Sequence, residues 1–132
     1  MPRTRLSGEK KEGGASSEGR EGEGGLYIST SFSSLPEGLF DELSDIATQT
    51  RKIFPRDLFS DAVLFFSSER KMGRAIGYVV PRKGGEKKTV WLSKEACLLI
   101  QEVSKKDKVS KNVVFLTALK MYSEKEGLNV RL

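Results

Sequence analysis

The sequence predicts a mostly helical protein with a two-stranded antiparallel β-ribbon, formed by a strand–helix–helix unit that occurs twice in one chain. Residues 26–32 and 89–92 each alternate apolar and polar side chains, as a half-exposed strand does. Two segments with apolar residues at helical spacing follow each strand. Residues 113–122 are apolar almost all round, and one unit of roughly 40 residues is too small to cover such a helix. We therefore expect the two units to interlock, with their strands paired.

Composition argues against an enzyme. The chain of 132 residues has no histidine and a single cysteine, Cys97, which excludes histidine-based catalysis, histidine metal sites and an internal disulfide. It has no GxxxxGK[ST] phosphate loop and no apolar run of the roughly 20 residues that a membrane helix needs. We expect no catalytic residues, cofactor, metal, small-molecule substrate or membrane partner. Without an apolar N-terminal signal, we expect a cytoplasmic location.

The positive charge is concentrated in one stretch of the chain. The net charge is +5, and residues 70–94 alone hold eight bases against the single acid Glu86. Residues 26–69 are acidic, with three bases and seven acids. A basic block of this kind favours a polyanionic partner, although a solvated linker has the same composition.

Four segments follow from these patterns. Residues 1–25 are rich in Gly, Ser and Glu, with almost nothing to bury, and predict a disordered tail. Residues 26–69 form the first strand–helix–helix unit, 70–86 a basic linker, and 87–132 the second unit.

The first strand presents Leu26, Ile28 and Phe32 on one face and Tyr27, Ser29 and Ser31 on the other. The stretch "SLPE" at 34–37 predicts that Ser34 caps the following helix, with Pro36 in its first turn. "IFPRD" at 53–57 ends that helix and opens the next.

In the second unit, Val90 and Leu92 are expected to face the helices, and Lys87, Thr89 and Trp91 to face outward. A shift of one residue would instead bury Trp91 and Thr89, and the sequence leaves that alternative open. Ser93 and Ser110 are placed to cap the two helices that follow.

The second unit, "KKTVWLSKEACLLIQEVSKKDKVSKNVVFLTALKMY", resembles the ribbon-helix-helix family of DNA-binding proteins. It has the family's alternating strand, Ser-capped first helix, short turn with V-S and apolar second helix. The duplicated chain is similar to the tandem ribbon-helix-helix regulators of archaeal filamentous viruses. This resemblance implies a βαα-βαα pseudo-dimer whose ribbon enters the major groove. The side chains facing the bases would be those on the outward faces of the strands: Lys87, Thr89, Trp91, Tyr27, Ser29 and Ser31.

The resemblance also implies a phosphate contact at the N-terminus of each unit's second helix, where backbone N–H groups and the helix dipole attract anions. The matching residues are Lys108, Ser110, Lys111 and Asn112, with Arg56 at the equivalent corner of the first unit. The chain departs from the family in two places. Lys108 stands where the family often has glycine, and Pro55 removes one N–H group.

The function expected from the resemblance is a sequence-specific double-stranded DNA-binding transcription regulator, acting as a repressor and assembling as a homo-oligomer. If the protein is viral, it would act in the host cytoplasm. Two alternatives stay open. One is an antitoxin-like protein that acts through a protein partner, and the other is a partition protein that binds a centromere.

Overall fold

The computed structural model describes residues 26–81, 84–128 and 130, so the tail predicted over 1–25 lies outside the described residues. The elements in chain order are β2 (Tyr27–Leu35), α1 (Leu39–Asp45), the π-helical η1 (Ile46–Arg51), α2 (Pro55–Lys71), β3 (Glu86–Ser93), α3 (Lys94–Asp107) and α4 (Lys111–Glu126). The predicted mostly helical fold with a two-stranded antiparallel sheet is confirmed.

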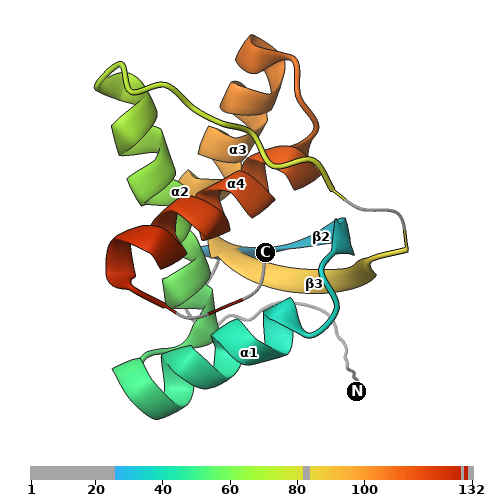
Figure 1. The fold of residues 1–132 in the computed structure, drawn as a ribbon, viewed down its shortest axis with the longest axis vertical. Helices are drawn as coiled ribbons and strands as arrows, with labels where there is room; N and C mark the ends of the chain where they lie inside the picture. Colours follow the sequence, from blue (N-terminus) through green and yellow to red (C-terminus); the bar gives the residue numbers. More distant parts are fainter. Residues whose placement is uncertain (1–25, 82–83, 129, 131–132) are drawn as a thin grey trace.

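The two strands form one antiparallel ribbon (Figure 1). Its ladder pairs Tyr27 with Ser93 at one end, and Ser31 with Thr89 at the middle. The register shifts between Phe32 and Leu35, where Ser34 has a φ of 59°. A bulge of this kind bends the strand and lets β2 run three residues beyond the predicted end.

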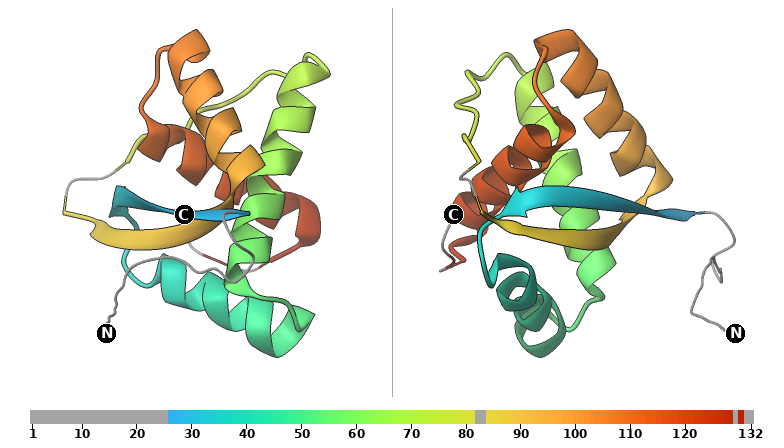
Figure 2. Two further views of the ribbon diagram at one scale, coloured as in Figure 1. Left: turned by 180° about the vertical axis from the view of Figure 1, so that it is seen from behind. Right: turned by 90° about the vertical axis from the view of Figure 1, so that its right-hand side faces the viewer.

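The helices cover the ribbon from several sides. α1 lies on one side of the ribbon and α3 on the other, an arrangement seen in all three views of Figures 1 and 2. α2 and α4 pack against each other, α2 also contacts β3, and α4 also contacts β2. The helix that follows β2 by way of α1 and η1 thus packs on β3, and the last helix of the chain packs on β2.

Phenylalanine rings form the centre of the core. Phe32 of β2 stacks on Phe115 of α4 with ring centroids 4.1 Å apart and an interplanar angle of 10°. Phe59 of α2 lies 6.0 Å from Phe115, so rings from both units meet at one point. Burial of such large rings stabilises the fold, with further gain from aromatic pairing.

Helix α4 is covered as the sequence predicts. Its six consecutive residues from Val114 to Leu119 are all buried, and Thr117 among them is fully inaccessible to solvent. Only a helix surrounded by other elements buries side chains on every face. The prediction that one unit cannot cover this helix agrees with its contacts to α2, α3 and β2.

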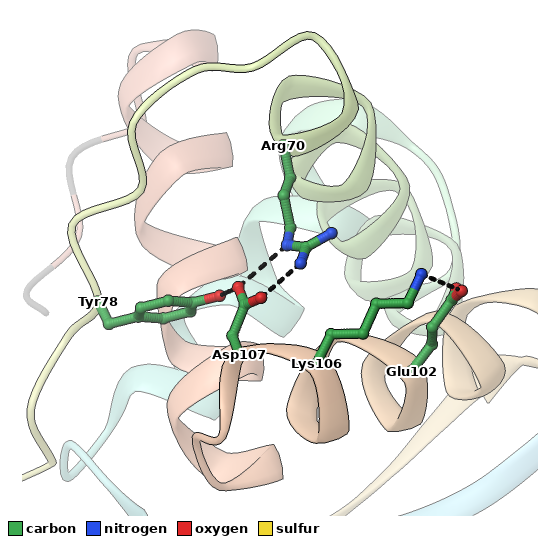
Figure 3. A network of polar contacts seen from close by, with 5 residues as sticks. All are labelled: Arg70, Tyr78, Glu102, Lys106 and Asp107. Carbon is green, nitrogen blue, oxygen red and sulfur yellow. Dashed lines mark hydrogen bonds and ion pairs between the residues drawn. The ribbon is translucent and has the colours of Figure 1, made fainter.

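The connection from α2 to β3 packs along the helices. The Val79 N–H donates to Thr117 Oγ1 of α4 at 2.9 Å. The Tyr78 hydroxyl donates to Asp107 Oδ2 at the end of α3, and Arg70 of α2 reaches the same carboxylate (Figure 3). α2 ends at Lys71 and β3 begins at Glu86, so the linker is a little shorter than the predicted 70–86.

The first helix starts later than predicted. Ser34 lies in β2, and the N-cap of α1 is Gly38, which has a φ of 81°. The Gly38 N–H donates to Glu86 Oε1 of β3 at 3.3 Å. The prediction that Ser34 caps this helix was wrong because the chain continues to pair with β3 until Leu35.

The helix starts of the second unit are as predicted. Ser93 Oγ accepts from the Ala96 N–H at 3.1 Å, and Ser110 Oγ accepts from the Val113 N–H at 3.2 Å. Both serines have extended backbone and cap their helices through the side chain.

Candidate nucleic-acid interface

One face of the ribbon points away from the helices, and we call it the outer ribbon face. It consists of six exposed side chains: Ser29, Ser31, Ser33, Lys87, Thr89 and Trp91. Between them, Val90 and Leu92 are 1% and 0% exposed, so β3 alternates strictly between outer face and core. The outer ribbon face thus carries hydroxyls, one ammonium group and one indole.

Trp91 lies on this face with 42% of its surface exposed. The alternative register, which would have buried Trp91 and Thr89, is wrong. The apolar Val90 and Leu92 fill the core positions, and a one-residue slip would turn both toward solvent. Trp91 stands opposite Ser29 across the ladder, so its ring has only a small side chain beside it there.

The middle of the outer ribbon face is a pair of hydroxyls. Ser31 Oγ and Thr89 Oγ1 lie 3.2 Å apart, and either group can donate to the other. A hydroxyl holds one donor and two acceptor positions, so each retains capacity for a further partner outside the ribbon.

The first strand follows the predicted pattern less closely. Ser29 and Ser31 are exposed and Phe32 is buried, as expected. Leu26 and Ile28, however, are 63% and 39% exposed, although we predicted them on the core face. The helices therefore bury Leu92 but leave Ile28, its partner across the ladder, partly exposed at the start of β2.

Tyr27 is half-buried and tied to the start of α2. Its hydroxyl donates to Asp57 Oδ1 at 2.7 Å, and the Arg56 guanidinium lies 4.1 Å from the centre of its ring. Arg56 also lies 4.9 Å from the ring centre of Phe54. The structure thus joins a predicted base contact, Tyr27, to a predicted phosphate contact, Arg56.

Asn112 holds the opposite end of β2. Its Oδ1 accepts from the Ser33 N–H at 3.0 Å, and its Nδ2 donates to Ser33 Oγ at 2.8 Å. Ser33 was missed by the sequence reasoning, because Ser34 was interpreted as a helix cap and the strand was ended at Phe32. The continued alternation in "STSFSS" was the signal that could have identified it.

The remaining predicted phosphate contacts gather at the start of α4. Lys108, Ser110 and Lys111 are all exposed there. Lys108 is the C-cap of α3 and has left-handed backbone, with φ 57° and ψ 45°, at a position without glycine. The first N–H groups of α4 beyond the Ser110 cap are the kind that bind anions.

The two second helices begin at opposite ends of the ribbon. α2 starts beside Tyr27, at the first residue of β2, and α4 starts beside Ser33, near its last. An anion at each helix start would thus lie on either side of the outer ribbon face.

The two helix starts differ in chemistry. α4 begins with Lys111 and has no acid in its first turn. α2 begins with Pro55 after the exposed Phe54, and Asp57 lies in its first turn. Attraction of an anion should therefore be stronger at α4 than at α2.

A polar cluster joins α2, α3 and the connection, away from the predicted site. The guanidinium of Arg70 and the hydroxyl of Tyr78 lower the pKa of Asp107 to about 2. Burial and the bond to Asp107 raise the pKa of Tyr78 to about 12. Burial also raises the pKa of the Cys97 thiol, which is typical of a structural rather than a reactive cysteine.

Among the described residues, no group of three or more Cys, Asp and Glu side chains is arranged so that it could hold a metal ion. None of its helices combines the length and apolar character needed to cross a membrane.

Comparison of the chain with protein-family models, with curated proteins and with solved structures found no match. The features that bear on function are therefore the geometry of the outer ribbon face and of the two helix starts that flank it.

Proposed function

We propose that the protein binds double-stranded DNA by placing its outer ribbon face in the major groove. The groove is wide enough for a two-stranded ribbon, and its base edges offer acceptors and donors for lysine, threonine and serine. The observation that carries the proposal is the exposure of Lys87, Thr89 and Trp91 on a strand whose intervening residues, Val90 and Leu92, are buried against the helices. More narrowly, we propose a tandem ribbon-helix-helix transcription regulator.

Equivalent residues in the two units support the narrower proposal. Lys52 and Lys108 both adopt left-handed backbone at a helix end, with φ of 59° and 57°. Each precedes the second helix of its unit by the same number of residues. Ser31 and Thr89, at the middle of the ladder, are the pair about which the two strands would be related by an approximate two-fold axis.

The two strands would contribute unequally to DNA recognition. β2 offers Ser29, Ser31 and Ser33 to the groove, whereas β3 offers Lys87, Thr89 and Trp91. β3 would therefore supply most of the affinity, and the bound site would be asymmetric rather than palindromic. Occupation of a promoter by copies assembled along the DNA would repress transcription.

Footprinting on DNA of the source genome across a salt series tests the proposal. We expect a protected site whose affinity falls steeply with salt, by about 0.9 logarithmic units of slope for each phosphate contact. Lys87→Ala should cost roughly 1–3 kcal/mol of binding and relax the sequence preference. Lys111→Ala should weaken binding to all sequences alike.

Lys105→Ala is the matched control, because Lys105 is also exposed but lies near the end of α3 remote from β3. It should leave the affinity within about twofold of wild type, since it meets neither bases nor phosphates. If Lys87→Ala and Lys105→Ala had the same effect, the outer ribbon face would not be the contact surface. A protein partner that co-purifies stoichiometrically, with no footprint, would favour the antitoxin-like alternative.

A further inference from the structure

Two ion pairs join the ends of helices from different units. Since α2 runs to Lys71 and β3 begins at Glu86, the first unit extends here over residues 26–71, instead of the predicted 26–69, and the second unit begins at residue 86. Arg51, which ends η1, pairs with Glu126, which ends α4. Arg70, near the end of α2, pairs with Asp107, which ends α3, and its Nε lies 3.0 Å from Asp107 Oδ2. All four side chains are more than two-thirds buried.

The two ion pairs occupy equivalent places with the charges exchanged. Each joins the end of one unit's first helix to the end of the other unit's second helix. Arg51 and Asp107 are separated by the same number of residues as Arg70 and Glu126. Lys52 and Lys108 have this separation too, so each pair occupies equivalent positions in the two units. The first unit therefore supplies the cation to both ion pairs, and the second unit supplies the anion to both.

This arrangement has a consequence for pairing. If two first units paired with each other, Arg51 of one would face Arg70 of the other at both places. Two second units would bring Asp107 against Glu126 twice. Like charges that are largely desolvated repel each other, and such repulsion is a known means of rejecting wrong partners. The apolar core alone gives less discrimination, since Phe59 and Phe115 occupy matching positions.

We propose that the exchanged ion pairs make the interface between units selective, so that the first unit accepts a second unit and rejects a copy of itself. The partner that fits is the complementary unit of the same chain, or of a second chain in a reciprocal exchange. The inference rests on the two-unit architecture given under the proposed function, but it does not require DNA binding.

Charge variants of the full chain separate the two kinds of pairing. The crossed variant carries Arg51→Glu and Asp107→Arg. When unlike units pair, that is a first unit with a second, it sets Glu against Glu at one ion pair and Arg against Arg at the other. When like units pair, that is two first units or two second units, it sets opposite charges against each other. Arg51→Glu with Glu126→Arg, the control variant, keeps opposite charges in both kinds of pairing. Both variants have the net charge of the wild type, and both share the change at Arg51.

A disulfide across the middle of the ribbon reports which strands are paired. With Cys97→Ala, Ser31→Cys and Thr89→Cys, unlike units form a 31–89 disulfide, whereas like units form 31–31 and 89–89 disulfides. The protein is refolded in a glutathione redox buffer, so that the thiols exchange until the favoured pairs accumulate. Peptide mapping by mass spectrometry then gives the proportion of each disulfide.

We expect the 31–89 disulfide to dominate in the wild-type background, and the like-unit disulfides to rise by about tenfold in the crossed variant relative to the wild type. In the control variant, the proportion of like-unit disulfides should lie between those of the wild type and the crossed variant. Loss of helical circular dichroism in the crossed variant alone would also support the proposal, since the control carries equally drastic charge changes. Equal proportions of like-unit disulfides in all three backgrounds, with all three folded, would overturn it.

Discussion

Ser31 and Thr89 face each other at the middle of the ribbon, with their hydroxyl oxygens 3.2 Å apart. The pair is exposed, and it is the point at which the two strands contribute side chains of the same chemistry. If the ribbon enters the major groove, these hydroxyls lie at the centre of the bound site.

Thr89→Val should weaken binding to the preferred DNA site by roughly 1–3 kcal/mol, because valine keeps the shape of threonine and loses the hydroxyl. Ser31→Ala should cost less, since Thr89 would remain to contact the base. Fluorescence anisotropy with the footprinted site measures both. Thr50→Val, at an exposed position in η1, is the control and should not change the affinity. An unaltered affinity in Thr89→Val would remove Thr89 from the readout.

Thr117→Val should loosen the connection between the units. Thr117 is fully buried and accepts the Val79 N–H, so valine leaves that N–H without its acceptor at a cost of about 1–3 kcal/mol. Urea denaturation gives the loss of stability, and limited proteolysis should show faster cleavage within residues 72–81. Thr117→Ser retains the hydroxyl and should protect the connection better than valine does. Equal cleavage rates in the two variants would contradict the assigned role of the hydroxyl.

Asp107 should make stability depend on acid pH. Its pKa is lowered from 3.8 to about 2, chiefly by the bond from Arg70, so its contribution to folding is present above pH 3.8. That contribution is lost as the pH falls toward 2, because the unfolded chain takes up the proton first. Asp107→Asn should be less stable than wild type at pH 7, and the difference should shrink below pH 4. Thermal unfolding across this range measures it, with the exposed Asp45→Asn as the control.

Lys108→Gly should separate folding from DNA binding. Lys108 has a φ of 57°, a conformation that costs a residue with a Cβ roughly 1 kcal/mol, so glycine should raise the free energy of unfolding by a similar amount. The same change removes a charge beside the start of α4, and the salt slope of DNA binding should fall by about 1. Lys52→Gly, with a φ of 59°, is the stability control. Its effect on DNA binding should be smaller, since Pro55 and Asp57 weaken anion binding at that corner. A tighter complex for Lys108→Gly would argue against phosphate contact at α4.

Local patterns predicted the second unit well. The alternation of 89–92 fixed the face of Lys87, Thr89 and Trp91, because only one register buries both Val90 and Leu92. Ser93 and Ser110 each cap a helix through a hydrogen bond to the N–H group three residues later, so the local sequence is enough to predict both caps.

Interactions between distant residues determined what the sequence did not predict. The start of α1 moved because β2 continued to pair with β3, and the bulge at Ser34 has no strong local signal. Asn112, a predicted phosphate contact, also bonds to Ser33, which lies 79 positions earlier in the chain, and the sequence did not predict that bond. The bond from the hydroxyl of Tyr27, a predicted base contact, to Asp57 was not predicted either. Such contacts depend on how distant parts of the chain pack together, which residue spacing alone does not specify.

Protection of DNA from dimethyl sulfate would show whether the outer ribbon face lies in the major groove. This reagent methylates guanine N7 in the major groove and adenine N3 in the minor groove. We expect the bound protein to protect guanine N7 within the footprint while adenine N3 stays reactive, and we expect Lys87→Ala to restore reactivity at one or two guanines only. Protection of adenine N3 with guanine N7 left reactive would place the protein in the minor groove instead.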